Sequence, residues 1–289
     1  MRVFAISDMH GRLEGLDPKE ADLVVVAGDF GIMNGWDRWH LYGQVDWVNT
    51  HLAEWCASYP KTRFRFVPGN HDLFAEQPGL LSEVKLPANA KLLIDEEDVV
   101  DGARIYGSPW VPAINGWWAF EERHEGQLRM AFGAIPQGVD ILLTHTPPKI
   151  PHRKVDVSID RNSPHFGSVE LLDALKERRP RYALCGHIHT GDHSPITLRH
   201  PDGSQTVVRN VSRLDESYEV RSEPFVFDLC AGEHHRASGY VNLRVRHAAT
   251  GGVGVLSRGE GWWEGRRIIC SCGNQPKGRR YMRLEVTIP

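Results

Sequence analysis

The sequence has little of what marks secreted, membrane or nucleic-acid-binding proteins. No apolar run approaches the roughly 20 residues that a membrane-spanning helix needs, and the run at residues 2–6 is too short for a signal peptide. The five cysteines are odd in number and irregularly spaced, which argues against a disulfide framework and favours a reducing compartment. The net charge of -3 offers no general attraction for nucleic acid. We therefore expect a cytoplasmic protein with no membrane segment and no strong indication of nucleic-acid binding.

Charge is spread unevenly along the chain. Residues 230–289 contain ten Gly, nine Arg and one Lys but only four acidic residues, so this segment carries about +6. Residues 1–229 hold 24 basic and 33 acidic residues, and their hydrophobic periodicity is much clearer. We predict one folded domain over residues 1–229 and a basic, Gly- and Arg-rich C-terminal extension over residues 230–289. The sequence assigns no role to this extension and leaves the oligomeric state open.

Short apolar runs alternate with helical periodicity in residues 1–229. The pattern predicts helices over 40–59 and 168–178, and strands over 2–6, 22–27, 64–67, 103–106, 140–143, 182–185, 206–211 and 225–229. Leu23 to Val26 is continuously apolar, as in strands that are buried on both faces. The order strand, connection, strand, helix, strand predicts an α/β fold with a largely parallel sheet.

Polar turns with metal-binding side chains follow five of these strands. They are Asp8-Met9-His10, Gly28-Asp29, Gly69-Asn70-His71-Asp72, Thr144-His145 and Gly186-His187-Ile188-His189. Open α/β sheets build their sites at the carboxyl ends of strands. Any one turn has an ordinary explanation, because an Asp after a strand often caps a helix and a lone His often packs in a core. Five such turns in one chain favour a shared site.

The chemistry of these side chains indicates a metal centre. Carboxylates, one amide oxygen and several imidazoles suit Mn²⁺, Fe or Zn²⁺, and they outnumber the ligands of one tetrahedral zinc. Two ions about 4 Å apart can activate water and hold the oxygens of a phosphoryl group. The residue types therefore favour phosphoester hydrolysis at a dinuclear site.

The ordered motifs D-x-H, G-D, G-N-H-[DE], H and G-H-x-H resemble the calcineurin-like metallophosphoesterase superfamily over roughly residues 1–229. The resemblance implies a four-layer α-β-β-α sandwich of two mixed sheets. It implies one metal held by Asp8, His10, Asp29 and His189, and a second held by Asp29, Asn70, His145 and His187, with Asp29 bridging. His71 would act on the leaving group or the phosphoryl oxygens, Asp72 would orient His71, and Asn70 would also contact the phosphate.

Residues 106–112, 116–120, 142–148 and 167–172 resemble the MPPED branch of cyclic-nucleotide-type phosphodiesterases. This implies hydrolysis of a small phosphodiester or nucleotide by a metal-bridging hydroxide, often with Mn²⁺. Some members of the branch replace a histidine of G-H-x-H and lose activity, whereas His187 and His189 are both present here. The alternatives are a phosphomonoesterase or nucleotide pyrophosphatase of the same superfamily, and an inactive scaffold.

Three tryptophans lie in the region of this second resemblance. Trp110, Trp117 and Trp118 are candidates for a surface on which a nucleobase stacks, or alternatively for packing between elements. Of the three, we assign Trp110 to the border of the substrate pocket.

Overall fold

The structure, a computed structural model, describes residues 1–33, 38–157 and 165–229, and four strands beyond them. The chain divides into two units, residues 1–236 and 237–289. In the second unit β12 (Arg244–Arg246) pairs with β13 (Val253–Val255), and β14 (Gly261–Glu264) pairs with β15 (Arg267–Cys270), both antiparallel. The predicted boundary at residue 230 and the unassigned extension stay predictions.

The first sheet has the strand order β11-β1-β2-β3-β4. It consists of β1 (Arg2–Ile6), β2 (Leu23–Ala27), β3 (Arg63–Val67), β4 (Ala90–Leu92) and β11 (Phe225–Asp228). The first four strands are parallel, and β11 runs antiparallel to β1. All five residues of β2 are buried, as its continuous apolar run predicts.

The second sheet has the strand order β5-β6-β7-β8-β10-β9. It consists of β5 (Glu96–Val100), β6 (Ala103–Ser108), β7 (Ile141–Thr144), β8 (Tyr182–Cys185), β9 (Ile196–Arg199) and β10 (Gln205–Asn210). The four central strands are parallel, and the edge strands β5 and β9 are antiparallel to their neighbours. Both sheets are therefore mixed.

Helices and short helical turns lie between the strands along the chain. They are α1 (Arg38–Trp47), a π-helical turn (Val48–Leu52), α2 (Ala53–Ala57), a 3-10 turn (Leu73–Glu76), α3 (Pro78–Leu81), α4 (Gln127–Gly133) and α5 (Val169–Arg178). Ser168 caps α5, because its Oγ accepts a hydrogen bond from the Leu171 amide at 3.0 Å. No helix in the described part of the chain is long and apolar enough to cross a bilayer.

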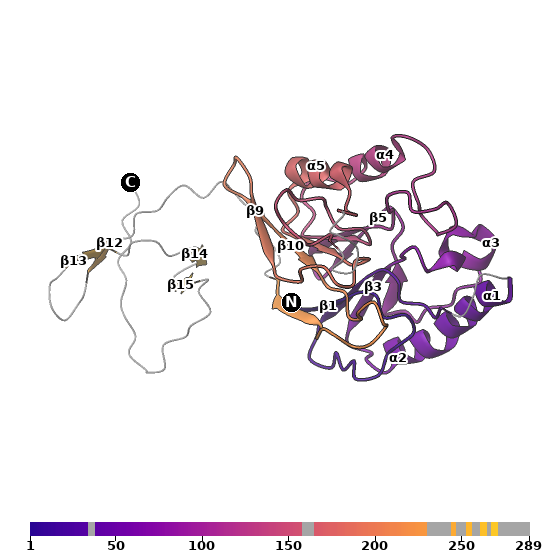
Figure 1. Cartoon of the computed structure of the whole chain (residues 1–289). Helices are drawn as coiled ribbons and strands as arrows, with labels where there is room; N and C mark the ends of the chain where they lie inside the picture. Colours follow the sequence, from indigo (N-terminus) through magenta and orange to yellow (C-terminus); the bar gives the residue numbers. More distant parts are fainter. Residues whose placement is uncertain are drawn as a thin grey trace. The chain divides into compact units, whose positions relative to one another are not determined.

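Alternate residues of each strand pack on opposite faces, and this alternation creates the layers. Phe4 and Ile6 of β1 face the helical segment α1–α2, whereas Val3 and Ala5 pack toward Ile141 of the second sheet. The outer face of the second sheet packs against α4 and α5. Helices thus cover both outer faces of the two sheets (Figure 1), and the predicted four-layer α-β-β-α sandwich is confirmed.

Candidate metal centre

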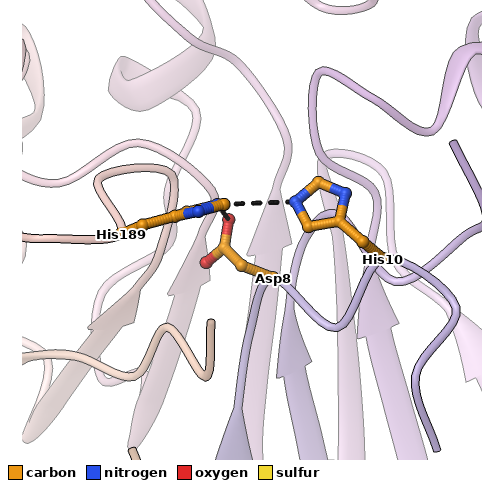
Figure 2. Close-up of side chains that lie close together, drawn as sticks. All are labelled: Asp8, His10 and His189. Carbon is orange, nitrogen blue, oxygen red and sulfur yellow. Dashed lines mark hydrogen bonds and ion pairs between the residues drawn. The ribbon is translucent and has the colours of Figure 1, made fainter. Parts of the chain in front are cut away.

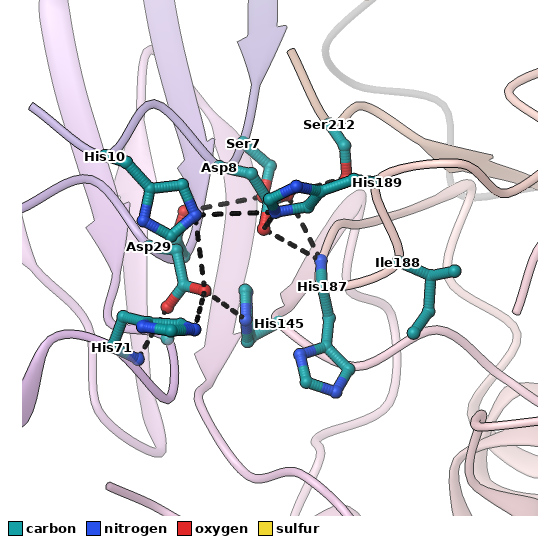
Figure 3. A network of polar contacts seen from close by, with 12 residues as sticks. Ser7, Asp8, His10, Asp29, His71, His145, His187, Ile188, His189 and Ser212 are labelled. Carbon is teal, nitrogen blue, oxygen red and sulfur yellow. Dashed lines mark hydrogen bonds and ion pairs between the residues drawn. The ribbon is translucent and has the colours of Figure 1, made fainter. Parts of the chain in front are cut away.

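The five polar turns meet at the carboxyl ends of β1, β2, β3, β7 and β8. Backbone hydrogen bonds join them in space: the Asp8 amide donates to the Gly28 carbonyl at 3.0 Å, and the Gly186 amide donates to the His145 carbonyl at 2.9 Å. Ser7 joins the two sheets, since its amide donates to the Val211 carbonyl at 3.0 Å. The parallel order of the strands therefore gathers residues that lie far apart in the sequence (Figure 3).

Four of the predicted ligand residues have left-handed backbone conformations. The φ angles are 53° at Asp8, 45° at His10, 51° at Asp29 and 68° at His187. A non-glycine residue held in such a conformation costs on the order of 1–3 kcal/mol. Strain of this kind concentrates at functional sites, where the surrounding structure holds the side chains in place.

Asp8, His10 and His189 form the first group of possible ligands. Their side chains point toward one another (Figure 2), and His189 Nε2 lies 3.4 Å from both Asp8 Oδ1 and His10 Nε2. One ligand atom from each residue lies within 4.8 Å of the others. The group is buried, so these atoms lie where the local dielectric is low.

Asp8, Asp29 and His145 form the second group, again with ligand atoms within 4.8 Å of one another. His145 Nε2 lies 3.1 Å from Asp29 Oδ2 and 2.9 Å from Asn70 Oδ1. Asp29 Oδ2 is also 3.9 Å from His10 Nε2. This oxygen therefore lies between the two groups, where a bridging carboxylate would be.

The hydrogen bonds behind the imidazoles show that these groups fit a cation. His145 Nδ1 is 2.9 Å from the Ala27 carbonyl and His189 Nδ1 is 3.0 Å from the Asp215 carbonyl, so each Nδ1 carries the proton. In a neutral ring the Nε2 lone pair then faces carboxylate and amide oxygens, which are acceptors too. Acceptors that converge in this way require a positive charge among them, either a second proton on the ring or a metal ion.

The closeness of buried carboxylates and imidazoles also shifts the pKa values in the site. Burial lowers the pKa of His145 and of His189, but the carboxylates of Asp29 and Asp8 respectively outweigh it and raise each pKa to about 9. Burial raises the pKa of Asp8, yet the hydrogen bond and charge of His189 bring it below its usual range. Burial lowers the pKa of His10 to about 4, which leaves this ring neutral. The site thus presents charged carboxylates and an unprotonated imidazole to an incoming cation.

Two serines support the buried carboxylate of Asp8. Ser7 Oγ and Ser212 Oγ each donate to Asp8 Oδ2 at 2.6 Å, and the His187 amide lies 3.1 Å from both carboxylate oxygens. These bonds orient Oδ1 toward His189. Sequence reasoning missed Ser212, because it follows a strand whose end carries no recognisable motif.

His187 is brought beside the site but belongs to neither group of ligand atoms in the described residues. Its ring centroid is 5.0 Å from that of His145, and in Figure 3 its ring points away from His10. Its backbone amide, as noted above, supports Asp8. Its assignment as a ligand stays a prediction.

Asp72 does not have the partner that the sequence suggested. Its carboxylate accepts hydrogen bonds from the amides of Gly31 and Gly69, both at 2.8 Å, and from the Phe30 amide at 3.4 Å. The buried Nδ1 of His71 has no hydrogen-bond partner among the described residues. We therefore correct the expectation that Asp72 orients the His71 imidazole: it holds together the turns that follow β2 and β3.

The tryptophans have separate roles. Trp110 donates from Nε1 to Asp95 Oδ2 at 2.7 Å and packs edge-on against Phe120, as an element in a packed interface does. Trp118 lies against His71, with ring centroids 4.1 Å apart, and Trp117 is 78% exposed. Of the three tryptophans, Trp118 is therefore the one in contact with the site, while the placement of Trp110 at the substrate stays a prediction.

Two further residues border the site without a sequence signal. The ring of Tyr218 packs edge-on against His10, with centroids 4.9 Å apart. Gln44 donates to the His71 carbonyl at 2.7 Å and accepts from the Phe74 amide at 3.2 Å, which holds the turn that carries His71. Only tertiary contacts bring these residues to the site.

Comparisons with known proteins give this geometry a family. The family model for calcineurin-like phosphoesterases matches residues 1–191. The human "Metallophosphoesterase domain-containing protein 1" is 32% identical over 251 residues, covering 79% of this chain and 71% of the human protein. A UPF0046 protein of Caenorhabditis elegans is 27% identical, covering 79% of this chain and 81% of its own length. A solved structure that is 16% identical has a TM-score of 0.53, covers 78% of this chain and 98% of that chain, and bears on the fold alone.

The chain belongs to the calcineurin-like phosphoesterase family. Members of this family typically bind two divalent metal ions, and the groups described above are candidate ligands for them. Membership supports a metal-binding phosphoester hydrolase.

Proposed function

We propose that this protein is a dinuclear metal-dependent phosphodiesterase that acts on cyclic nucleotides or similar small phosphodiesters. The observation that carries the proposal is the pair of buried ligand groups with Asp29 Oδ2 between them, 3.1 Å from His145 Nε2 and 3.9 Å from His10 Nε2. Asp8, His10 and His189 would hold one ion, and His145, Asn70 and His187 the other, with Asp29 shared. Mn²⁺ is our first choice among Mn²⁺, Fe and Zn²⁺, all of which suit mixed oxygen and imidazole ligands.

Two divalent ions bound there would supply the positive charge that activates water and stabilises phosphoryl oxygens. The chain itself contributes rigid positioning. Ser7 and Ser212 hold Asp8, while the Ala27 and Asp215 carbonyls fix the tautomers of His145 and His189. A site whose ligands are fixed in advance loses little entropy when the substrate arrives.

His71 is the candidate for direct action on the substrate. Its side chain is 15% exposed, and its Nε2 lies 4.0 Å from Asp29 Oδ2 of the second group. Burial lowers its pKa, which favours the neutral ring. A neutral ring donates one N–H, so we assign His71 to a hydrogen bond with a phosphoryl or leaving oxygen, and proton delivery to the leaving oxygen is the alternative.

A nucleotide substrate is supported by the aromatic side chain beside His71. The Trp118 ring centroid is 4.1 Å from that of His71, and the neighbouring Trp117 is largely exposed. Stacking of a base on an aromatic ring is worth about 1–3 kcal/mol. We also propose a cytoplasmic location, which is supported by cysteine usage, since Cys56 and Cys185 are free thiols.

The first experiment measures hydrolysis of bis-p-nitrophenyl phosphate by metal-stripped protein, with and without added Mn²⁺. We expect strong metal-dependent turnover that Asp29→Ala and Asn70→Ala abolish while the protein stays folded. A folded Asn70→Ala enzyme with full activity would refute the mechanism. A higher rate on p-nitrophenyl phosphate than on the diester would favour a monoesterase. Failure of the folded protein to bind metal would favour an inactive scaffold.

A further inference from the structure

A cavity of about 300 Å³ lies behind the metal centre, between the end of β10 and the segment that leads into β11. Its lining includes the side chains of His193, Arg209, Ser212, Ser222 and Glu223. None of the cavity's residues is among the predicted metal ligands. The lining has both polar and apolar residues, so the polar side chains decide which ligand the cavity would bind.

Arg209 is the most distinctive group in this cavity. Its guanidinium lies over the ring of Phe225, 4.0 Å from the centroid, and it has no hydrogen-bond or ion-pair partner among the described residues. Phe225 in turn stacks on Phe227, which stacks on Tyr182, with centroids 4.9 and 4.2 Å apart. This column of rings packs on one side of the guanidinium, whose N–H groups bond to none of the described residues. A planar fork of N–H donors matches the oxygens of phosphate or carboxylate.

A second unused polar group lies beside it. His193 Nδ1 is 3.0 Å from Ser222 Oγ, while its Nε2 is buried and has no partner among the described residues. A buried ring nitrogen without a partner costs roughly 1–3 kcal/mol relative to a bonded one. A ligand oxygen in the cavity would remove that cost.

The local charge favours an anion. Glu223 is the only acidic residue in the lining, and it is exposed, so solvent screens its carboxylate. Burial and then the charge of Arg221 lower the pKa of His193, the Asp8 carboxylate and the His189 backbone act against them, and Arg209 again lowers it. Burial lowers the pKa of Arg209, with no carboxylate acting against it. Arginine nevertheless stays charged in proteins, so the cavity holds an uncompensated cation.

We propose that this cavity is a second binding site, separate from the metal centre, for a small oxyanion of the phosphate class. Arg209 would bind two oxygens through its fork, and His193 Nε2 and the hydroxyl of Ser222 would complete the contacts. Ser212 lines the cavity and also donates to Asp8 Oδ2 at 2.6 Å. The bound anion would thus lie one hydroxyl group away from a residue of the metal centre.

The test is a titration of the metal-free full-length chain with inorganic phosphate, followed by calorimetry and by ³¹P line width. We expect binding that sulfate competes with and that Arg209→Gln weakens by about tenfold or more, as loss of charge-assisted hydrogen bonds does. The matched control is Arg63→Gln, which removes an exposed arginine on β3 and should leave the affinity unchanged. His193→Gln, expected to weaken binding severalfold, is the second variant should Arg209→Gln not fold.

Three results would overturn the proposal. Phosphate could fail to bind the folded metal-free wild type. It could bind folded Arg209→Gln or His193→Gln as tightly as the wild type. Phosphate binding could also be lost in His71→Ala and retained in Arg209→Gln. That result would place the anion among the histidines of the metal centre. All three measurements are made without metal, so none depends on the proposed phosphodiesterase activity.

Discussion

Ser212→Ala is the sharpest test of how the fold supports the metal centre. The substitution removes one oxygen, adds no volume and leaves the other donors to Asp8 in place: Ser7 Oγ at 2.6 Å and the His187 amide at 3.1 Å. Asp8 and Ser212 are both fully buried, so their hydrogen bond is shielded from bulk solvent. The variant therefore isolates one hydrogen bond to a buried charge.

The expected magnitude follows from this geometry. A hydrogen bond to a charged group contributes about 1.5–3 kcal/mol. Two other donors remain, so we expect the free energy of unfolding of the metal-free protein to fall by about 2 kcal/mol. Loss of a partner that orients a metal ligand typically lowers metal affinity by about 10–100-fold. We expect the lower end of that range, because only one of the three donors to Asp8 is lost.

The assay combines urea unfolding of the metal-free protein with competition for Mn²⁺ against a chelator. Ser204→Ala is the matched control, because Ser204 Oγ also donates to an aspartate, at 2.7 Å from Asp202 Oδ1, but on the exposed surface. This control should leave both the free energy of unfolding and the Mn²⁺ affinity unchanged. If Ser212→Ala behaves like Ser204→Ala in both measurements, the hydrogen bond has no supporting role and the reasoning is wrong.

The remaining predictions concern the substrate, the core and pH. Trp118→Ala should raise KM for a cyclic nucleotide by about tenfold with a smaller effect on kcat, because the Trp118 ring lies against His71; an unchanged KM would contradict the stacking role. Gly186→Ala should destabilise the fold by several kcal/mol, because its Cβ would overlap Ser7 Oγ and Asp8 Oδ2, and a normal Tm would exclude this crowding. The hydrogen bond and charge of Arg104 hold the pKa of Glu97 below its usual value, so their stabilising effect is present above about pH 4.3 and is lost as pH falls further. The difference in the free energy of unfolding between wild type and Glu97→Gln should therefore be smaller at pH 3.5 than at pH 7, as measured by urea unfolding. An equal difference at both pH values would refute the stabilising effect of Arg104 on Glu97.

Local sequence patterns predicted most of the central architecture. The strands over 2–6 and 182–185 were predicted with the bounds that the structure has, and the helix expected over 40–59 extends from residue 38 to residue 57. Apolar runs between polar turns carry this information because the burial of a strand depends on its own side chains. The sequence did not reveal the short or edge strands β4, β5 and β9 or the helices α3 and α4. The sequence patterns of these segments are weak, and contacts with neighbouring elements determine their structure.

Within the site, too, the sequence predicted one part of the arrangement and the tertiary structure decided the rest. The sequence alone determined which residue types stand after which strands, and a parallel sheet then brings those strand ends together, so Asp8, Asp29 and His145 could be named in advance. Only the tertiary structure decided that Asp72 binds backbone amides, that Trp118 rather than Trp110 touches His71, and that Ser212 supports Asp8. Ser212 and Asp8 are 204 residues apart, and no local pattern encodes such a contact. A hydrogen bond depends on the position of both groups to within a fraction of an ångström, and that position is set by the packing of the two sheets rather than by either segment alone.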